Sequence, residues 1–225
     1  MTPRGQPLAD LWWLVSRASG IVALVLISLS VMLGLAMAAK VLKRPAFKRG
    51  AARLHEHVAL TALLAIGSHG LALLGDRWLK PGWSGITVPF ALSYRPAFTG
   101  VGIIGGYIAL LLGPSFYLRR RLGARRWRRM HSLIVVSWLL SIVHTLGSGS
   151  DAKQLWLRVI VVAPGIPIVY LLTLRLLKPT KAPAPRARTA DDRARDANER
   201  AQRRGAAHGP AHGASRARLS APADA

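Results

Sequence analysis

Residues 53–70 read RLHEHVALTALLAIGSHG, and this stretch decides how the rest of the chain is interpreted. His55 lies near its start and His69 near its end, with an apolar run between them. The hydrocarbon of a membrane penalises ionisable side chains, so a histidine kept inside a membrane helix indicates function by default. What these two histidines do depends on what the rest of the chain places beside them.

The composition indicates a membrane protein. The 225 residues are 51% hydrophobic yet carry a formal net charge of +23, which fits apolar spans joined by basic connectors. About 20 apolar residues cross a bilayer as a helix. Five stretches come close to that length: 11–39, 54–75, 99–118, 131–148 and 155–177. We therefore expect an all-α integral membrane bundle of about five transmembrane helices.

Two regions near these stretches need separate interpretation. The first stretch is longer than a secretory h-region of about 7–15 residues, so we expect an uncleaved helix. The block 82–98 is interrupted by glycine, proline and Arg95, and we expect a loop at the membrane interface. The chain has no cysteine, which excludes disulfides, thiolate metal sites and cysteine-ligated iron–sulfur clusters.

Lysine and arginine alternate between the connectors. The connector 40–53 is rich in both residues, and residues 119–129 include seven arginines. The positive-inside rule places these connectors in the cytoplasm. We therefore expect a multi-pass protein of the cytoplasmic membrane, with its N-terminus outside and its C-terminus in the cytoplasm.

Residues 178–225 differ in composition from the rest of the chain. They are rich in alanine, arginine, proline and glycine, so we expect a disordered basic cytoplasmic tail, in which His208 and His212 are solvated. Nucleic-acid binding is not expected, because no aromatic residue lies among the arginines.

The five histidines outside this tail all lie in the second and fourth apolar stretches, which cross the membrane in the same direction. At ~1.5 Å per residue, His55 and His69 are about 21 Å apart along their helix, and His131 and His144 about 20 Å apart. We therefore expect two cross-helix pairs at matching depths, His55 with His131 and His69 with His144. A flat cofactor taking one axial ligand from each helix fits twice, and haem with bis-histidine ligation is the obvious candidate.

Helical phase tests this arrangement. At ~100° per residue, His69 returns to within about 40° of His55, whereas His57 points some 120° away from His69, so we exclude His57 as a ligand. His131 and His144 are about 140° apart on an ideal helix. Ligation by His131 therefore requires a local irregularity at the start of its helix. Met130 has the better phase and is the lower-ranked alternative, since His/Met ligation of haem exists.

The pattern H-x13-H on one helix, followed two helices later by H-x12-H, resembles the ferric reductase-like transmembrane domain family. That family includes NADPH oxidases, ferric reductases and the haem-bearing membrane subunit of a bacterial periplasmic methionine sulfoxide reductase system. The x12 spacing is the family's own in its second histidine helix. The resemblance covers roughly residues 11–177.

This resemblance implies a helical core that holds two b-type haems, with His55, His69, His131 and His144 as axial ligands of the iron. Electrons would pass from the cytosolic side through an inner haem to an outer one. No soluble flavin and nicotinamide domain accompanies the spans, so any flavin would come only through a separate partner. The donor is then a flavoprotein reductase or a membrane quinol, and a separate acceptor lies outside.

Other residues suggest supporting roles. Arg17 either meets a propionate of the outer haem or extends outward to the lipid headgroups, and Arg53 is placed to serve the inner haem in the same way. Glu56 is expected to pair with an arginine at the interface. The glycines of 102–106 favour close helix packing, and Pro114 is expected to kink the third span.

Three functions remain open from the sequence. The leading one is a bis-haem membrane cytochrome b, an oxidoreductase or its electron-transfer subunit, with ferric iron, dioxygen or a periplasmic enzyme as acceptor. The second is a divalent-metal protein, although zinc ligands must converge to within ~2.1 Å of one ion and histidines about 20 Å apart cannot. The third is a non-catalytic membrane scaffold, which leaves the paired histidines unexplained.

Overall fold

The computed structural model describes residues 7–177 and 190–207, and every regular element in these ranges is helical. The helices are α1 (Pro7–Ala38), α2 (Pro45–Ala72), α3 (Gly82–Thr87), α4 (Pro96–Leu112), α5 (Arg119–Leu122), α6 (Ala124–His131), α7 (Ile134–Ser148), α8 (Leu155–Leu177) and α9 (Ala190–Ala207), with 3-10 turns η1 (Leu73–Gly75) and η2 (Pro114–Phe116). Contacts divide the chain into residues 1–178 and 179–225, which are described separately.

Within residues 7–177 and 190–207, five helical segments are long and apolar enough to cross a membrane. They are Leu11–Ala38, Pro45–Gly75, Pro96–Phe116, Ala124–Ser148 and Leu155–Leu177. The expected all-α architecture with five candidate spanning helices is confirmed.

Three of the helices begin at a proline, earlier than hydropathy alone predicts. Pro7, Pro45 and Pro96 open α1, α2 and α4, because the fixed φ of proline suits the first turn, where its missing N–H is not needed. The predicted starts at 11, 54 and 99 mark only where the apolar residues begin. Helix α2 therefore continues through the basic connector.

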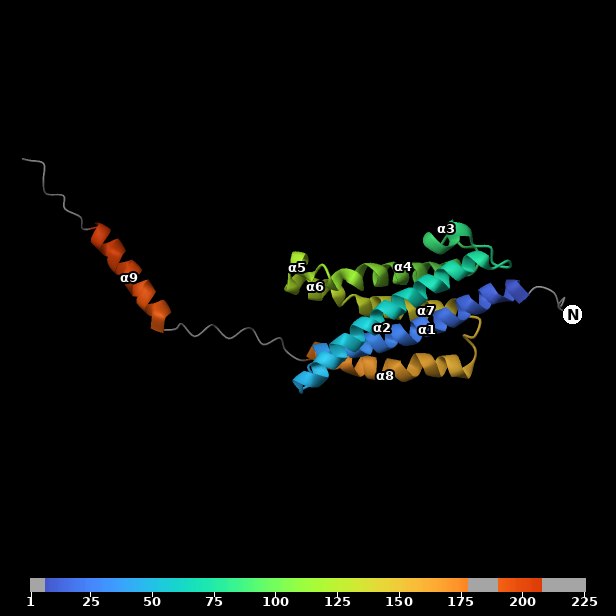
Figure 1. Ribbon diagram of the computed structural model, residues 1–225, viewed down its shortest axis with the longest axis horizontal. Helices are drawn as coiled ribbons and strands as arrows, with labels where there is room; N and C mark the ends of the chain where they lie inside the picture. The colour runs from blue at the N-terminus through green and yellow to red at the C-terminus, as the bar shows by residue number, and fades with distance from the viewer. Residues whose placement is uncertain (1–6, 178–189, 208–225) are drawn as a thin grey trace, which may run out of the picture. The chain divides into compact units, whose positions relative to one another are not determined.

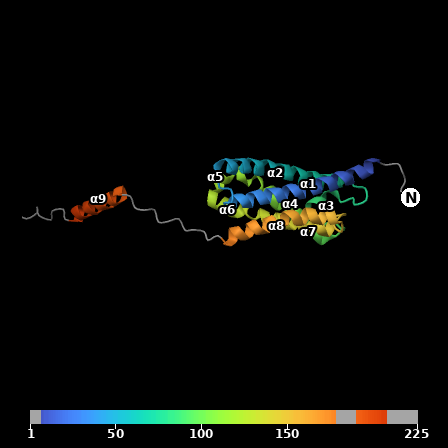
Figure 2. The ribbon, with the colours of Figure 1, turned by 90° about the horizontal axis from the view of Figure 1, so that it is seen from below.

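Helix α1 lies at the centre of the bundle. It packs along α2 and α8 and also contacts α7, while α4 packs along α7 (Figures 1 and 2). The buried core joins side chains of α1, α7 and α8: Ile27, Val31, Leu35, Trp138, Ile168 and Leu171. Two helix pairs, α1–α2 and α4–α7, thus make up most of the bundle.

Buried polar contacts fix α7 against its neighbours. The indole Nε1–H of Trp138 donates to the Ser28 hydroxyl on α1 at 3.0 Å. The adjacent Ser137 hydroxyl donates to the Gly105 carbonyl on α4 at 2.7 Å. Hydrogen bonds between helices hold membrane bundles together where the hydrophobic effect does not. They set the rotation of α7 about its own axis.

Two local expectations differ from the structure. The block 82–98 is not all loop, since it contains α3 and the first residues of α4. The segment just before this block is held by Asp76, whose carboxylate accepts hydrogen bonds from the backbone N–H groups of Trp78 and Leu79 at 2.8 and 3.0 Å. At Pro114 the third span changes from α-helix to a 3-10 turn instead of continuing as a kinked α-helix: α4 ends at Leu112, and η2 begins at the proline.

Residues 190–207, which belong to the expected disordered tail, form α9 in the structure. Alanine, arginine, glutamate and glutamine favour helices even without a core. Opposite charges four residues apart, such as Asp196 with Arg200 and Glu199 with Arg203, add support along the helix. Residues 178–189 and 208–225, with His208 and His212, lie outside the described residues.

Replacing Trp138 tests the buried junction between α1 and α7. Trp138 is 4% exposed, so Trp138→Ala should lower the free energy of unfolding by about 3 kcal/mol through the cavity it leaves. Trp78 is 78% exposed, and Trp78→Ala is the control, expected to change that free energy by about 0.5 kcal/mol or less. Thermal or denaturant unfolding in detergent measures both, and equal effects would contradict this core.

Candidate functional site

The four histidines that the sequence analysis pairs by depth form two pairs in the structure. The His55 ring on α2 and the His131 ring at the end of α6 have centroids 6.2 Å apart, at an interplanar angle of 87°. The rings of His69 on α2 and His144 on α7 have centroids 6.0 Å apart, at 75°. The structure thus brings together the residues that equal depth predicted to meet.

Each imidazole donates its Nδ1–H to a main-chain carbonyl of a neighbouring helix. The acceptors are Ser30 for His55 at 2.9 Å, Ser16 for His69 at 2.8 Å, Leu112 for His131 at 3.1 Å and Phe98 for His144 at 2.9 Å. A carbonyl only accepts, so these contacts assign the proton of a neutral ring to Nδ1. The Nε2 lone pair is then available for a metal.

A repeat on α1 serves the two histidines of α2. Ser16 and Ser30 are fourteen residues apart, the same spacing as His55 and His69. Besides their carbonyls, their hydroxyls lie 3.1 Å from Nδ1 of His69 and 3.2 Å from Nδ1 of His55. Four helical turns take about 14 residues, so both contacts lie on one face of α1.

Glycines let the backbone approach these rings. Gly20 and Gly34 follow the two serines in the repeat S-x-x-x-G, and a Cβ on Gly20 would lie 2.9 Å from Nδ1 of His69. On α4, a Cβ on Gly102 would collide with the ring of His144. The sequence analysis missed this repeat, although its fourteen-residue period was visible beside the histidine spacing. For residues 102–106 the sequence favoured close helix packing over room for a flat ring.

A break in the fourth span resolves the phase problem of His131. Helix α6 ends at His131, and α7 begins at Ile134 after a turn at residues 132 and 133. The ideal-helix angle of about 140° therefore does not apply. The turn after His131 is the local irregularity that was expected, and His131 lies beside His55. The alternative ligand, Met130, is 38% exposed.

His57 does not join the pairs. It is exposed, and its Nδ1 donates to the Arg53 carbonyl of its own helix at 2.8 Å. Beside it, Glu56 meets Tyr117, whose hydroxyl donates to Oε1 at 2.8 Å, rather than the expected arginine. This hydrogen bond to a carboxylate raises the pKa of the exposed Tyr117. The suggested role of Arg53 toward the inner haem stays a prediction.

Arg17, for which the sequence suggested a haem propionate or the lipid headgroups, is paired with a carboxylate instead. Its Nε and Nη2 donate to the two carboxylate oxygens of Asp151 at 2.6 and 2.8 Å, and its guanidinium lies 5.1 Å from the centroid of the Trp13 ring. The pair joins α1, next to Ser16, to the connection after α7. In this structure the guanidinium binds the Asp151 carboxylate, so its contact with a haem propionate stays a prediction.

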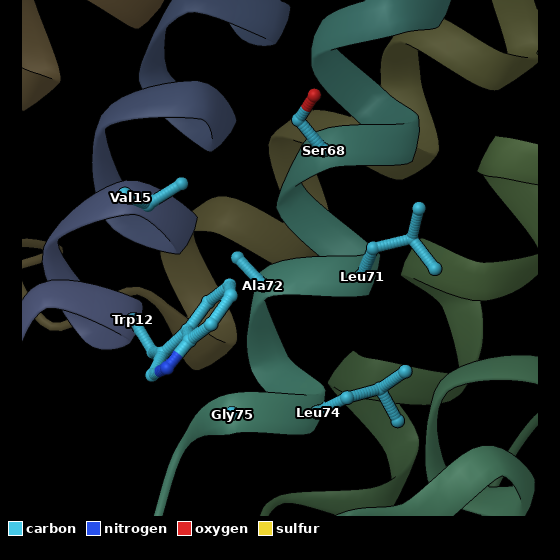
Figure 3. A pocket seen from close by; sticks show the side chains of 7 residues that line it. All are labelled: Trp12, Val15, Ser68, Leu71, Ala72, Leu74 and Gly75. Atoms are coloured by element: carbon cyan, nitrogen blue, oxygen red, sulfur yellow. The ribbon is translucent and has the colours of Figure 1, made fainter. Parts of the chain in front are cut away.

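An open apolar pocket of about 560 Å³ lies between the start of α1 and the end of α2 (Figure 3). Its lining residues are Trp12, Val15, Ser68, Leu71, Ala72, Leu74 and Gly75. Ser68 and Val15 are chain neighbours of His69 and Ser16. The lining contains no charged or metal-binding side chain, so the pocket adds no ligand to the His69–His144 pair.

The donor set fits haem better than a bare ion. A metal–imidazole bond is about 2 Å, and a ring nitrogen lies roughly 1 Å from its ring centre, so two imidazoles on opposite sides of one metal have centroids roughly 6 Å apart. Within residues 7–177 and 190–207, no group of three or more histidine, aspartate or glutamate side chains is placed to hold a metal ion. Two nitrogens complete a coordination sphere when a porphyrin supplies the other four.

A double-mutant cycle measures the Arg17–Asp151 pair. The two side chains are 35% and 15% exposed, so we expect a coupling energy of about 1 kcal/mol between Arg17→Ala and Asp151→Ala. Arg17→Lys should lose most of it, because an ammonium cannot form the bidentate contact. Unfolding of the four chains of the cycle measures the coupling. Additive effects would show that the pair contributes nothing.

The chain is similar to a haem-binding subunit over part of its length. It is 33% identical over 94 residues to the protein-methionine-sulfoxide reductase haem-binding subunit MsrQ of Salmonella arizonae (strain ATCC BAA-731 / CDC346-86 / RSK2980). The match covers 41% of this chain and 39% of the relative, so the chain spans about two fifths of that protein's length. No family model matches, and no solved structure matches significantly. The partial match is to a haem-binding subunit, which agrees with the resemblance in histidine spacing.

Proposed function

We propose that the chain is a b-type membrane cytochrome that binds two haems, one at each histidine pair, and carries electrons across the cytoplasmic membrane. The observation that carries this proposal is the geometry of the pairs. In each pair, two imidazoles from different helices have ring centroids 6.2 or 6.0 Å apart, and each ring donates a hydrogen bond from Nδ1 to a main-chain carbonyl. The similarity to a haem-binding subunit supports it independently.

The charge distribution supports a direction. The basic connectors 40–53 and 119–129 flank the His55–His131 pair in sequence, and α5 and α6 lie at the opposite end of the bundle from α3 (Figure 1). The positive-inside rule makes the His55–His131 pair the inner site and the His69–His144 pair the outer one. The N-terminus is then outside and the tail in the cytoplasm.

The residues of the chain fix the iron without reacting. When bound, haem supplies a metal that gains and loses one electron. His55 with His131 and His69 with His144 would each hold the iron of one haem, so the bound groups would supply electron transfer rather than dioxygen binding. The carbonyl hydrogen bonds at Nδ1 fix each ring and raise its basicity as a ligand. His55 and His69 are separated by about 21 Å along α2, so an electron passing between the two sites would cross most of the hydrocarbon layer.

This function needs partners on both sides. An electron enters from a flavoprotein reductase or a membrane quinol and leaves to an outer acceptor, so the chain is an oxidoreductase or the electron-transfer subunit of one. A divalent-metal site is less well supported, because each pair offers only two nitrogens. A scaffold role gives no reason for four imidazoles tied to carbonyls.

Single histidine variants test the pairing. His69→Ala and His144→Ala should each remove the same haem and spare the other, because each leaves one iron with a single axial ligand. His57→Ala is the control, since His57 is exposed and outside both pairs, and it should keep both haems. Pyridine haemochrome counting and redox titration of the purified variants identify which haem is lost. Loss of a different haem in each outer variant would contradict the pairing.

Glycine variants test the close approach of α4. Gly102→Ala should lower the occupancy of the outer haem several-fold, because the added methyl group meets the ring of His144. Gly67→Ala is the matched control, since a Cβ there meets nothing within 4 Å. If both variants retain equal amounts of outer haem, Gly102 is not needed to place His144.

A further inference from the structure

Trp127 lies against the histidine whose position is least fixed by its helix. It precedes His131 by one turn on α6, and the two rings stack with centroids 5.1 Å apart and planes 23° apart. The indole is half-buried, although Arg126 and Arg128 on either side of it are exposed. One face of His131 is therefore covered by an aromatic ring.

The same indole takes part in a hydrogen-bond chain that returns to His131. Trp127 Nε1–H donates to the Ser115 hydroxyl at 3.1 Å, and this hydroxyl donates to the Leu112 carbonyl at 2.6 Å. That carbonyl also accepts the Nδ1–H of His131 at 3.1 Å. Ser115 is 6% exposed, so the chain lies inside the protein. His131 is held on its face and at Nδ1 by connected groups.

The local fold explains why this support occurs here. Helix α4 ends at Leu112, and the last carbonyls of a helix lack partners within it, so the Leu112 oxygen is free for two donors. Helix α6 ends at His131, so no following helical turn fixes that ring. His55, His69 and His144 lie within helices instead. The support is therefore placed where the backbone is least regular.

We propose that Trp127 and Ser115 are positioning residues for His131 that set the occupancy and the midpoint potential of the inner haem. This inference rests on the proposed function. The Leu112 oxygen accepts two hydrogen bonds, one from the Ser115 hydroxyl and one from His131 Nδ1–H. Because the two donors share this oxygen, the Ser115 hydroxyl weakens the hydrogen bond from His131. Removing that hydroxyl strengthens the bond, makes the imidazole a stronger donor to iron and favours the ferric state. The network thus keeps the inner potential higher than an isolated histidine–carbonyl contact would.

Variants separate the two contributions. Trp127→Leu removes the stacking ring and should lose the inner haem, about half of the total, while the outer haem keeps its potential. Trp127→Phe restores a stacked ring without the N–H and should restore occupancy. Ser115→Ala should keep both haems and lower only the inner potential. Trp156→Leu, at a tryptophan outside this network, is the control and should change neither haem.

Redox titration and haem counting on the purified full chain decide the outcome. An unchanged inner haem in Trp127→Leu and Ser115→Ala would overturn the inference. Equal loss of both haems in Trp127→Leu, without rescue by Trp127→Phe, would also overturn it, because the tryptophan would then act on the whole fold. A wild-type chain without haem would instead overturn the proposed function, so the two failures are distinguishable.

Discussion

The architecture depends on the hydrogen bond between an imidazole Nδ1–H and a main-chain carbonyl of the adjacent helix. Such a bond fixes the tautomer and the rotation of the ring, and it satisfies a polar group where water is absent. It also requires the two helix backbones to lie close together. Gly20 follows from this requirement, because a Cβ there would lie 2.9 Å from Nδ1 of His69, whereas a Cβ on Gly34 would make only an ordinary contact with His55 at 3.4 Å.

The two histidine pairs share this bond but differ in their other support. Beside the His69–His144 pair, the Arg17–Asp151 ion pair joins α1 to the segment that follows α7. At the His55–His131 pair, the backbone of the fourth span is interrupted after His131, and Trp127 and Ser115 contact that part of the site. The two pairs thus have different surroundings, and under the proposed function this difference would let the chain set two different potentials.

Much of the fold follows from the sequence, for physical reasons. Hydropathy located five spans because hydrocarbon tolerates few polar residues, and the fourteen-residue spacing of His55 and His69 returned both rings to one helix face. The ion pair of Arg17 with Asp151 joins residues 134 positions apart, so no local pattern pointed to it. Helix α9 was missed because a charged segment can be helical through its own propensity, without the apolar face that periodicity detects.

The site was predictable in its pairing but not in its surroundings. Equal depth on two parallel helices indicated which histidines meet. The turn after His131 depends on how α6 packs near η2, which is a tertiary contact. The angle between His131 and His144 on an ideal continuous helix could show only that some irregularity was required. The carbonyl acceptors could not be predicted either, because every residue has a main-chain carbonyl and the sequence does not indicate which one accepts the hydrogen bond.

The most direct test of the central claim is the haem content of the purified wild-type chain, with a dithionite-reduced minus oxidised visible spectrum. We expect two b-type haems per chain, both six-coordinate and low-spin, since each iron would have two imidazole ligands. A chain that holds no haem when expressed with ample haem and iron would contradict it.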